Sequence, residues 1–209
     1  MRQPQTEAPV GSDAAAPKRV RNGADTKARI EREALRLFAL KGVDGATIRD
    51  LAIAVGVADA ALYRYYASKE EIAADIFRRH YSALAFEIRG VRERERPFAE
   101  TVRELVHLFC VLFDEQPDVF AFILLNQHAH LRFVDPHANV VAEVALIMAR
   151  AFEAREMAIA NCDLAAAISL GIVLQPAIFK LYGRLPGPLQ LQETDMTRAV
   201  ISSLGACGN

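Results

Sequence analysis

The sequence predicts an all-α protein of about nine helices, with a three-helix N-terminal domain and a larger helical C-terminal domain. Three observations lead to this fold class. Apolar side chains recur at helical spacing, helix-capping residues or prolines precede most apolar runs, and no alternation of apolar and polar residues persists long enough for a strand. We divide the chain into a low-complexity, disordered extension at 1–24, the small domain at 25–72 and the larger domain at 73–209.

The small domain begins with an amphipathic helix that runs from about residue 26 to Gly42. Its apolar side chains follow the i, i+4, i+7, i+8 pattern of one helix face: Ile30, Ala34, Leu37 and Phe38. Charged residues occupy most of the other positions. Gly42 favours the end of this helix, because glycine adopts the left-handed conformation of a helix C-terminus without penalty.

Two short helices joined by a sharp turn follow. Thr47 is placed to cap the second helix, with Asp50 returning the hydrogen bond in a capping-box pattern. Gly56 permits the turn because it accepts a positive φ. The third helix is expected over residues 58–65, with Leu62 pointing to the core. Two helices of this length around a glycine turn form a helix-turn-helix, which places its second helix in the DNA major groove.

Residues 26–72 resemble the DNA-binding domain of the tetracycline-repressor (TetR) family of bacterial transcriptional regulators. The matching residues occur in the same order along the chain: Ala34, Leu37, Phe38, Lys41, Gly42, Thr47-Ile48-Arg49-Asp50-Leu51-Ala52, Gly56, Val57, Leu62, Tyr63, Tyr66, Ser68, Lys69 and Glu70. The resemblance implies a helical body that binds a small molecule and dimerises through its last two long helices. Repression is the usual mode of action in the family.

The chain departs from the family pattern at two positions. Ala58 stands where the family usually has a Ser or Thr cap for the recognition helix, so either Asp59 caps the helix or the helix starts one residue later. Tyr66 stands where the family usually has Phe. Its hydroxyl group therefore needs a hydrogen-bond partner or water.

We select eight residues as DNA contacts: Thr47, Arg49, Asp59, Ala60, Tyr63, Arg64, Tyr65 and Lys69. The resemblance implies that four of them contact phosphates: Thr47, Tyr63, Tyr65 and Lys69. Ser68 and Glu71 predict a second capping box, which places Lys69 beside the free N–H groups of the next helix. Arg64 has the donors to bind a guanine edge, and Asp59 can accept from cytosine N4. The alternatives are a core position for Tyr63 and a solvated helix face for Arg64.

The charge distribution agrees with a DNA-binding N-terminal domain. Residues 18–69 hold eleven Lys or Arg and six Asp or Glu, whereas residues 70–209 hold thirteen and eighteen. A basic domain on an acidic body is typical of a DNA reader. Three basic residues precede the first helix and either follow DNA phosphates or belong to a solubilising tail: Lys18, Arg19 and Arg21.

Beyond the small domain the pattern predicts only helices. They are expected over about residues 69–90, 97–114, 117–128, 136–157, 163–182 and 194–204. Capping residues, or proline at the first helical position, mark their starts. These residues are Ser68 with Glu71, Pro97, Pro117, Asp135 with Pro136, Asp163, and Thr194 or Asp195.

The resemblance places an effector pocket among the helices between the small domain and the dimerising pair. It points to seven lining residues: Phe109, Phe113, Ile123, Leu124, Glu143, Ile147 and Gln175. Apolar walls with a few polar groups suit a small hydrophobic or aromatic molecule. The other aromatic side chains at helical spacing are expected in the core.

The helix at 164–182 is apolar nearly all round and contains small residues that permit close helix approach. We expect it to form a homodimer interface together with the helix at 194–204, the alternative being burial inside one subunit. Its apolar run spans about 16 residues and contains Gln175 and Pro176. A membrane span needs about 20, so we expect no membrane partner.

No motif predicts an enzyme or a cofactor, since G-x-S-x-G, a Walker-type glycine loop and H-E-x-x-H are absent. His107 and Cys110 share a helix face, and His128, His130 and His137 follow, but surface or core-rim histidines explain them better than a metal site. Three cysteines without C-x-x-C spacing indicate a reducing compartment, here the bacterial cytoplasm.

The sequence thus predicts a ligand-responsive DNA-binding regulator that binds a palindromic operator as a homodimer. One alternative is a helix-turn-helix dimer without an effector, acting as an architectural or partner-recruiting protein. Another is a helical enzyme that retains a vestigial DNA-binding domain.

Overall fold

The computed structural model describes residues 23–125 and 138–205, and every regular element within them is a helix. In chain order these are α1 (Gly23–Gly45), α2 (Ile48–Val55), α3 (Asp59–Leu62), α4 (Lys69–Glu93), α5 (Phe98–Glu115), α6 (Pro117–Phe120), the π-helix η1 (Ala121–Leu125), α7 (Val140–Glu153), α8 (Cys162–Leu181), the 3-10 helix η4 (Leu189–Gln192) and α9 (Glu193–Ser203). Nine α-helices and no strand in these two stretches confirm the all-α fold class.

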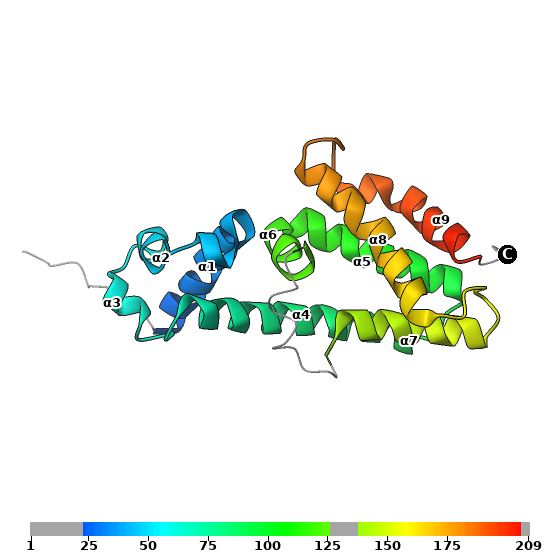
Figure 1. Ribbon diagram of the computed structural model, residues 1–209, viewed down its shortest axis with the longest axis horizontal. Helices are drawn as coiled ribbons and strands as arrows, with labels where there is room; N and C mark the ends of the chain where they lie inside the picture. The colour runs from blue at the N-terminus through cyan, green and yellow to red at the C-terminus, as the bar shows by residue number, and fades with distance from the viewer. Residues whose placement is uncertain (1–22, 126–137, 206–209) are drawn as a thin grey trace, which may run out of the picture.

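The helices form a small and a larger assembly that share α4. Figure 1 shows α1, α2 and α3 at one end of the molecule, and α4 running from them along the larger assembly. In the larger assembly, α7 packs against both α4 and α8, and α9 packs against α5. Because α4 belongs to both assemblies, a shift of its position would move the small domain relative to the body.

The turns predicted for the small domain are present. Thr47 Oγ1 accepts from the backbone N–H of Asp50, and Asp50 Oδ2 accepts from that of Thr47, both at 3.1 Å. Gly56 has a φ of 70° and Gly42 a φ of 71°. The Gly42 conformation breaks the helical geometry as predicted, although helical hydrogen bonding resumes up to Gly45.

The recognition helix is shorter than the predicted span of 58–65. Helix α3 covers only Asp59–Leu62, and a turn follows it. Ala58 is itself the N-cap residue and offers no side-chain hydrogen bond, so neither alternative holds: Asp59 does not cap the helix, and the helix starts directly after Ala58 without a side-chain cap. Leu62 is buried as predicted, with 1% of its surface exposed.

The second capping box is only half formed. Ser68 Oγ accepts from the N–H of Glu71 at 3.1 Å, as predicted. The Glu71 carboxylate, however, accepts from the N–H of Ala67 at 2.6 Å rather than from Ser68. The carboxylate therefore fastens the turn before α4 one residue further back than predicted.

Three helices of the larger domain start at residues other than those predicted. Helix α7 begins at Val140, where the Asn139 side chain accepts from two backbone N–H groups, and residues 138–139 are not helical. Asn161, rather than Asp163, caps α8. Helix α9 begins at Glu193, so Thr194 and Asp195 lie inside its first turn. Asparagine side chains thus cap α7 and α8, whereas Gln192, the N-cap residue of α9, makes no side-chain hydrogen bond to the helix.

The predicted helix at 117–128 changes its hydrogen bonding after one turn. Helix α6 is followed directly by η1, a π-helix, and residues 126–137 lie outside the described stretches. Phe122 of η1 stacks on Phe38 of α1 with ring centroids 5.9 Å apart and meets Phe77 of α4 edge-on at 6.1 Å. One buried hydrophobic core therefore continues from the small domain into the body.

Candidate nucleic-acid interface and effector pocket

The starts of α2 and α4 open onto one hollow on the small domain. The hollow has a volume of about 390 Å³. Thr47 and Ser68, the N-cap residues of the two helices, both line it, as do Tyr63 and Lys69. The N-terminus of a helix carries a partial positive charge and free N–H donors. Two such termini at one surface suit a phosphate group.

Most of the predicted DNA-contact residues are accessible. Tyr63 is 57% exposed, which excludes the core position considered for it. Five more of the eight have exposed side chains: Thr47, Arg49, Asp59, Ala60 and Arg64. Tyr65 is half-buried and packs against the core. Tyr63 and these five residues are therefore accessible to a DNA surface, whereas Tyr65 is less so.

Lys69 lies at the same hollow, but its ammonium group has other partners. Nζ donates to the carbonyl oxygens of Val43 at 2.8 Å, Asp44 at 3.3 Å and Ala46 at 2.9 Å. An ammonium group has three N–H donors, so all three are engaged. Lys69 thus fastens the last residues of α1 and the link to α2, and a direct phosphate bond would require release of a carbonyl.

Tyr66 connects the recognition segment to both long helices of the small domain. Its hydroxyl group donates to Glu31 Oε1 at 2.7 Å and lies 3.2 Å from Asp75 Oδ2. Arg79 Nη1 donates to the other Glu31 oxygen at 2.8 Å, and Lys27 lies over the Tyr66 ring at 5.4 Å from its centroid. Glu31 is therefore the hydrogen-bond partner that the Tyr66 hydroxyl was expected to need.

The charge state of this network follows from its surroundings. Burial and the neighbouring carboxylates of Glu31 and Asp75 raise the pKa of the Tyr66 phenol far above its usual range. Burial also disfavours ionisation of Asp75, but hydrogen bonds from Arg78 and Tyr66 and the charge of Lys27 outweigh it and lower its pKa. The phenol is therefore a donor and Asp75 an acceptor at neutral pH.

The seven residues predicted to line an effector pocket occupy three different settings. Five lie in one buried core: Phe109, Phe113, Ile123, Leu124 and Ile147. Gln175 is exposed on α8. Glu143 is 4% exposed and binds two arginines. Ile123 also lines a cavity, which spacing alone does not distinguish from an ordinary core position.

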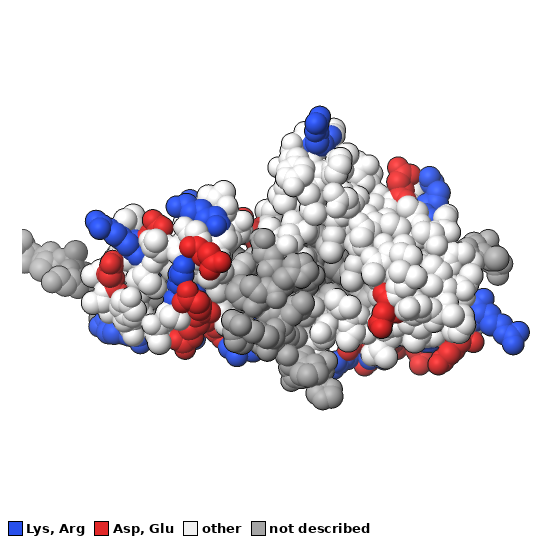
Figure 2. Space-filling view, in the orientation of Figure 1, with Lys and Arg blue, Asp and Glu red and all other residues white. Residues whose placement is uncertain are grey.

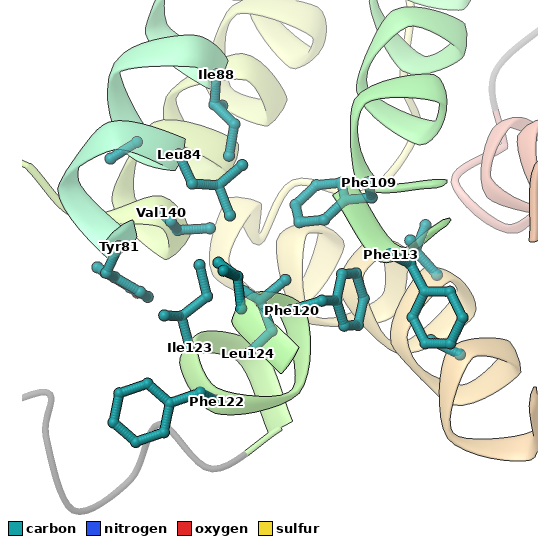
Figure 3. Packing of buried hydrophobic residues seen from close by; sticks show 14 of the residues in the cluster. Tyr81, Leu84, Ile88, Phe109, Phe113, Phe120, Phe122, Ile123, Leu124 and Val140 are labelled. Atoms are coloured by element: carbon teal, nitrogen blue, oxygen red, sulfur yellow. The ribbon is translucent and has the colours of Figure 1, made fainter. Parts of the chain in front are cut away.

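The cavity that Ile123 lines lies between α4 and α5 and is bounded by α6 and η1. Its volume is about 220 Å³. The sequence analysis missed its other lining residues: His80, Ala83, Leu84, Glu87, Leu108, Val111, Leu112, Glu115, Gln116 and Val119. The available signal was a pair of matching helical stripes, His80-Leu84-Glu87 on α4 and Leu108-Leu112-Glu115 on α5. Figure 3 shows Leu84 and Ile123 pointing toward each other, with Phe122 turned away.

Glu143 anchors the far end of α4 to α7. Its Oε1 accepts from Arg89 Nη2 at 2.7 Å and Nε at 2.9 Å, and its Oε2 accepts from Arg92 Nε at 3.0 Å. Arg150 of α7 donates to the backbone carbonyls of Arg92 and Arg96. These charge-assisted bonds hold the C-terminal half of α4 in the body while its N-terminal half carries the small domain.

One face of α8 remains uncovered. Leu164, Phe179 and Tyr182 are between 46% and 73% exposed. Figure 2 shows few charged side chains on the part of the surface that contains α8, in contrast to the small domain. Helix α8 has the length and hydropathy of a membrane span, with 28% of its most apolar window buried. One such helix is weak evidence for a membrane, because the core helix of a soluble protein can have the same length and hydropathy.

No group of three or more His, Cys, Asp or Glu within residues 23–125 and 138–205 is arranged to hold a metal ion. His107 instead lies 2.9 Å from Glu193. Three of the histidines considered above, His128, His130 and His137, lie outside the described residues, as do Lys18, Arg19 and Arg21.

Comparison with known proteins identifies the small domain. Residues 30–76 match the family model of bacterial regulatory proteins of the tetR family. A search of curated proteins finds no match. Three solved structures illustrate the likeness of the whole fold. The TetR family transcriptional regulator PfmR from Thermus thermophilus is 22% identical, with a TM-score of 0.65 over 87% of this chain and 100% of that one.

The other two were solved with ligands. FadR from Bacillus subtilis, in complex with stearoyl-CoA, is 14% identical, with a TM-score of 0.68 over 84% of this chain and 97% of that one. AibR, in complex with isovaleryl coenzyme A and operator DNA, is 18% identical, with a TM-score of 0.65 over 86% and 97%. At these identities the three structures share the fold of this chain.

Proposed function

We propose that this chain is a homodimeric transcriptional repressor of the bacterial cytoplasm. Its residues 30–76 place it in the tetR family of bacterial regulatory proteins. The repressor binds a palindromic operator, and a small apolar molecule releases it. The observation that carries the proposal is the hollow at which the N-termini of α2 and α4 meet beside an exposed Tyr63 and Arg64. The structure of AibR with operator DNA supports a DNA-binding role for this fold.

The contacts with DNA divide into two groups. Thr47 and Tyr63, at the hollow, bind phosphates together with the free N–H groups of α2 and α4. Arg49 adds a phosphate contact. Arg64, Asp59 and Ala60 face the base edges, where arginine reads guanine and aspartate accepts from cytosine. Lys69 and the half-buried Tyr65 act indirectly, by holding the surrounding backbone in place.

Two copies of the chain associate through the uncovered face of α8, with α9 beside it. A second copy would bury the exposed apolar side chains of α8, which are otherwise in water. A two-fold dimer presents two recognition helices, and these reach successive major grooves when they are about 34–36 Å apart. The operator is therefore palindromic.

Effector binding is transmitted through η1. Its Ile123 lines the cavity between α4 and α5, while the adjacent Phe122 packs on Phe38 of the small domain. A molecule that displaces Ile123 also shifts Phe122, and the small domain moves with it. Such a ligand lowers DNA affinity if it binds best to a conformation with the wrong spacing of the recognition helices. The acyl-CoA complexes of FadR and AibR support a ligand-responsive regulator of this fold.

One observation favours the alternative of a DNA-binding dimer without an effector. The cavity of about 220 Å³ is smaller than the 300–1,000 Å³ that is usual for drug-sized ligands. An effector-free dimer would retain operator binding, but no small molecule would raise its melting temperature.

The test is capture of genomic DNA fragments by the purified full chain, compared with a Tyr63→Ala/Arg64→Ala double variant. Both side chains are exposed, so the variant should remain folded. A matched control is Arg103→Ala, an exposed arginine on α5. Enrichment of one palindrome by the wild type and the control, and its loss in the double variant, supports the proposal. Equal enrichment by all three proteins would refute the assigned interface.

A further inference from the structure

The cavity between α4 and α5 combines apolar walls with two acidic side chains. Leu84, Leu108, Val111, Leu112, Val119 and Ile123 supply most of the wall. Because α4 and α5 run antiparallel, Glu87 near the C-terminal end of α4 and Glu115 at the C-terminal end of α5 lie toward opposite ends of the cavity, and both are exposed. Within residues 23–125 and 138–205, no Lys or Arg lines the cavity or forms an ion pair with either glutamate.

The remaining polar lining residues do not offset this charge. His80 is half-buried, and burial together with the nearby charge of Arg79 lowers its pKa below the ordinary value. It is therefore a neutral imidazole near pH 7 and adds no positive charge. Gln116 is uncharged. The described lining thus carries two negative charges and no positive one.

From this combination we infer that the cavity selects organic cations with an apolar body, such as an alkylammonium or arylalkylammonium ion. The apolar part occupies the space among the leucines, and the ammonium group pairs with one of the two carboxylates, Glu87 or Glu115, at an end of the cavity. A carboxylate or phosphate group at either end would meet a like charge, which disfavours anionic ligands. This inference rests on the proposed effector pocket and specifies its ligand class.

Three probes of equal chain length separate charge from hydrophobicity: n-hexylammonium, n-hexanol and hexanoate. Each is titrated into the full-length protein by calorimetry at pH 7.5 and low ionic strength. Because the carboxylates are exposed, an ion pair with either of them contributes modestly, so hexylammonium should bind about threefold more tightly than hexanol. Hexanoate should bind least tightly of the three.

Two variants and one control test the selectivity and the location of the site. Glu87→Gln/Glu115→Gln should abolish the preference for hexylammonium over hexanol, whereas Glu153→Gln, an exposed glutamate on α7 without an ion pair among the described residues, should not. Ala83→Phe adds bulk at an exposed lining position and should block all three probes.

The outcomes distinguish the ligand class from the pocket itself. Hexanoate binding as tightly as hexylammonium, with both blocked by Ala83→Phe, would overturn the cation inference and leave the effector pocket standing. Binding that survives Ala83→Phe would overturn the location. Absence of binding by all three probes would overturn the inference, and operator capture by the same protein would still report on the DNA-binding function separately.

Discussion

The hydroxyl oxygen of Tyr66 lies 2.7 Å from Oε1 of Glu31, a residue 35 positions earlier in the chain. This bond joins the segment after the recognition helix to α1. Arg79 of α4 binds the second oxygen of the same carboxylate at 2.8 Å. The orientation of the recognition helix is thereby tied to the helix that enters the body.

Tyr66→Phe should lower the free energy of unfolding by about 1.5 kcal/mol. A typical hydrogen bond contributes about 1 kcal/mol, and this one contributes more because its acceptor, the Glu31 carboxylate, is charged. Urea unfolding of the wild type and the variant measures the difference. Combined with Glu31→Gln in a double-mutant cycle, the experiment isolates the pair. A coupling energy near zero would show that the phenol and the carboxylate do not stabilise each other.

Lys69→Ala should lower the melting temperature, because three backbone carbonyls before α2 lose their donor. The sequence analysis placed Lys69 on a DNA phosphate, and loss of one phosphate contact would lower the slope of log K against log salt by about one. With all three N–H donors engaged, we expect weaker binding to every DNA sequence and a slope change clearly below one.

Differential scanning fluorimetry and a salt titration of DNA binding separate the two roles of Lys69. Lys41→Ala is a control, since Lys41 is an exposed lysine on α1 that forms no ion pair among the described residues. An unchanged melting temperature with a full unit change in slope would assign Lys69 to the phosphate.

The small domain was largely predictable because local chemistry determines its turns. The Thr47–Asp50 box and the positive φ of Gly56 require particular residue types at fixed spacing, and the structure shows both. The end of the recognition helix was not predictable from this chemistry. Tyr63 to Tyr65 have ordinary helix propensity, and the turn that they form depends on the burial of Leu62 and Tyr66.

The lining of the cavity was less predictable than the turns of the small domain. Spacing shows that Phe109 and Leu108 occupy neighbouring positions on one helix, but only the packing of α4 against α5 decides which of them faces a cavity. Glu143 illustrates the same difficulty. A lone acidic residue on an apolar helix face suggests a ligand contact, whereas its partners, Arg89 and Arg92, lie more than 50 positions earlier.

Glu143→Gln should lower the free energy of unfolding by about 2 kcal/mol, because hydrogen bonds between charged groups are replaced by weaker ones and two arginines lose their counter-charge. Chemical denaturation measures this loss. Glu153→Gln, on the same helix but exposed, should leave stability nearly unchanged. Equal effects of the two substitutions would mean that the buried ion pairs do not anchor α4 to α7.

Gly171→Glu should dissociate the proposed dimer. Gly171 lies in α8, its residue surface is exposed, and a Cβ atom added there meets no other atom of the described chain within 4 Å. In the monomer the substitution is therefore harmless and should even stabilise the helix by roughly 0.5–1 kcal/mol relative to glycine. A partner helix packed closely on this face would instead meet a charged side chain in an apolar contact, which carries a large desolvation cost.

Gly90→Glu provides the matched control, since Gly90 is also helical and also has open space around an added Cβ, but it lies on α4. Sedimentation equilibrium should show a dimer for the wild type and for Gly90→Glu, and a monomer for Gly171→Glu. Operator affinity should fall in parallel, because one recognition helix then binds without the other. A Gly171→Glu protein that remains dimeric would place the dimer interface elsewhere than on α8.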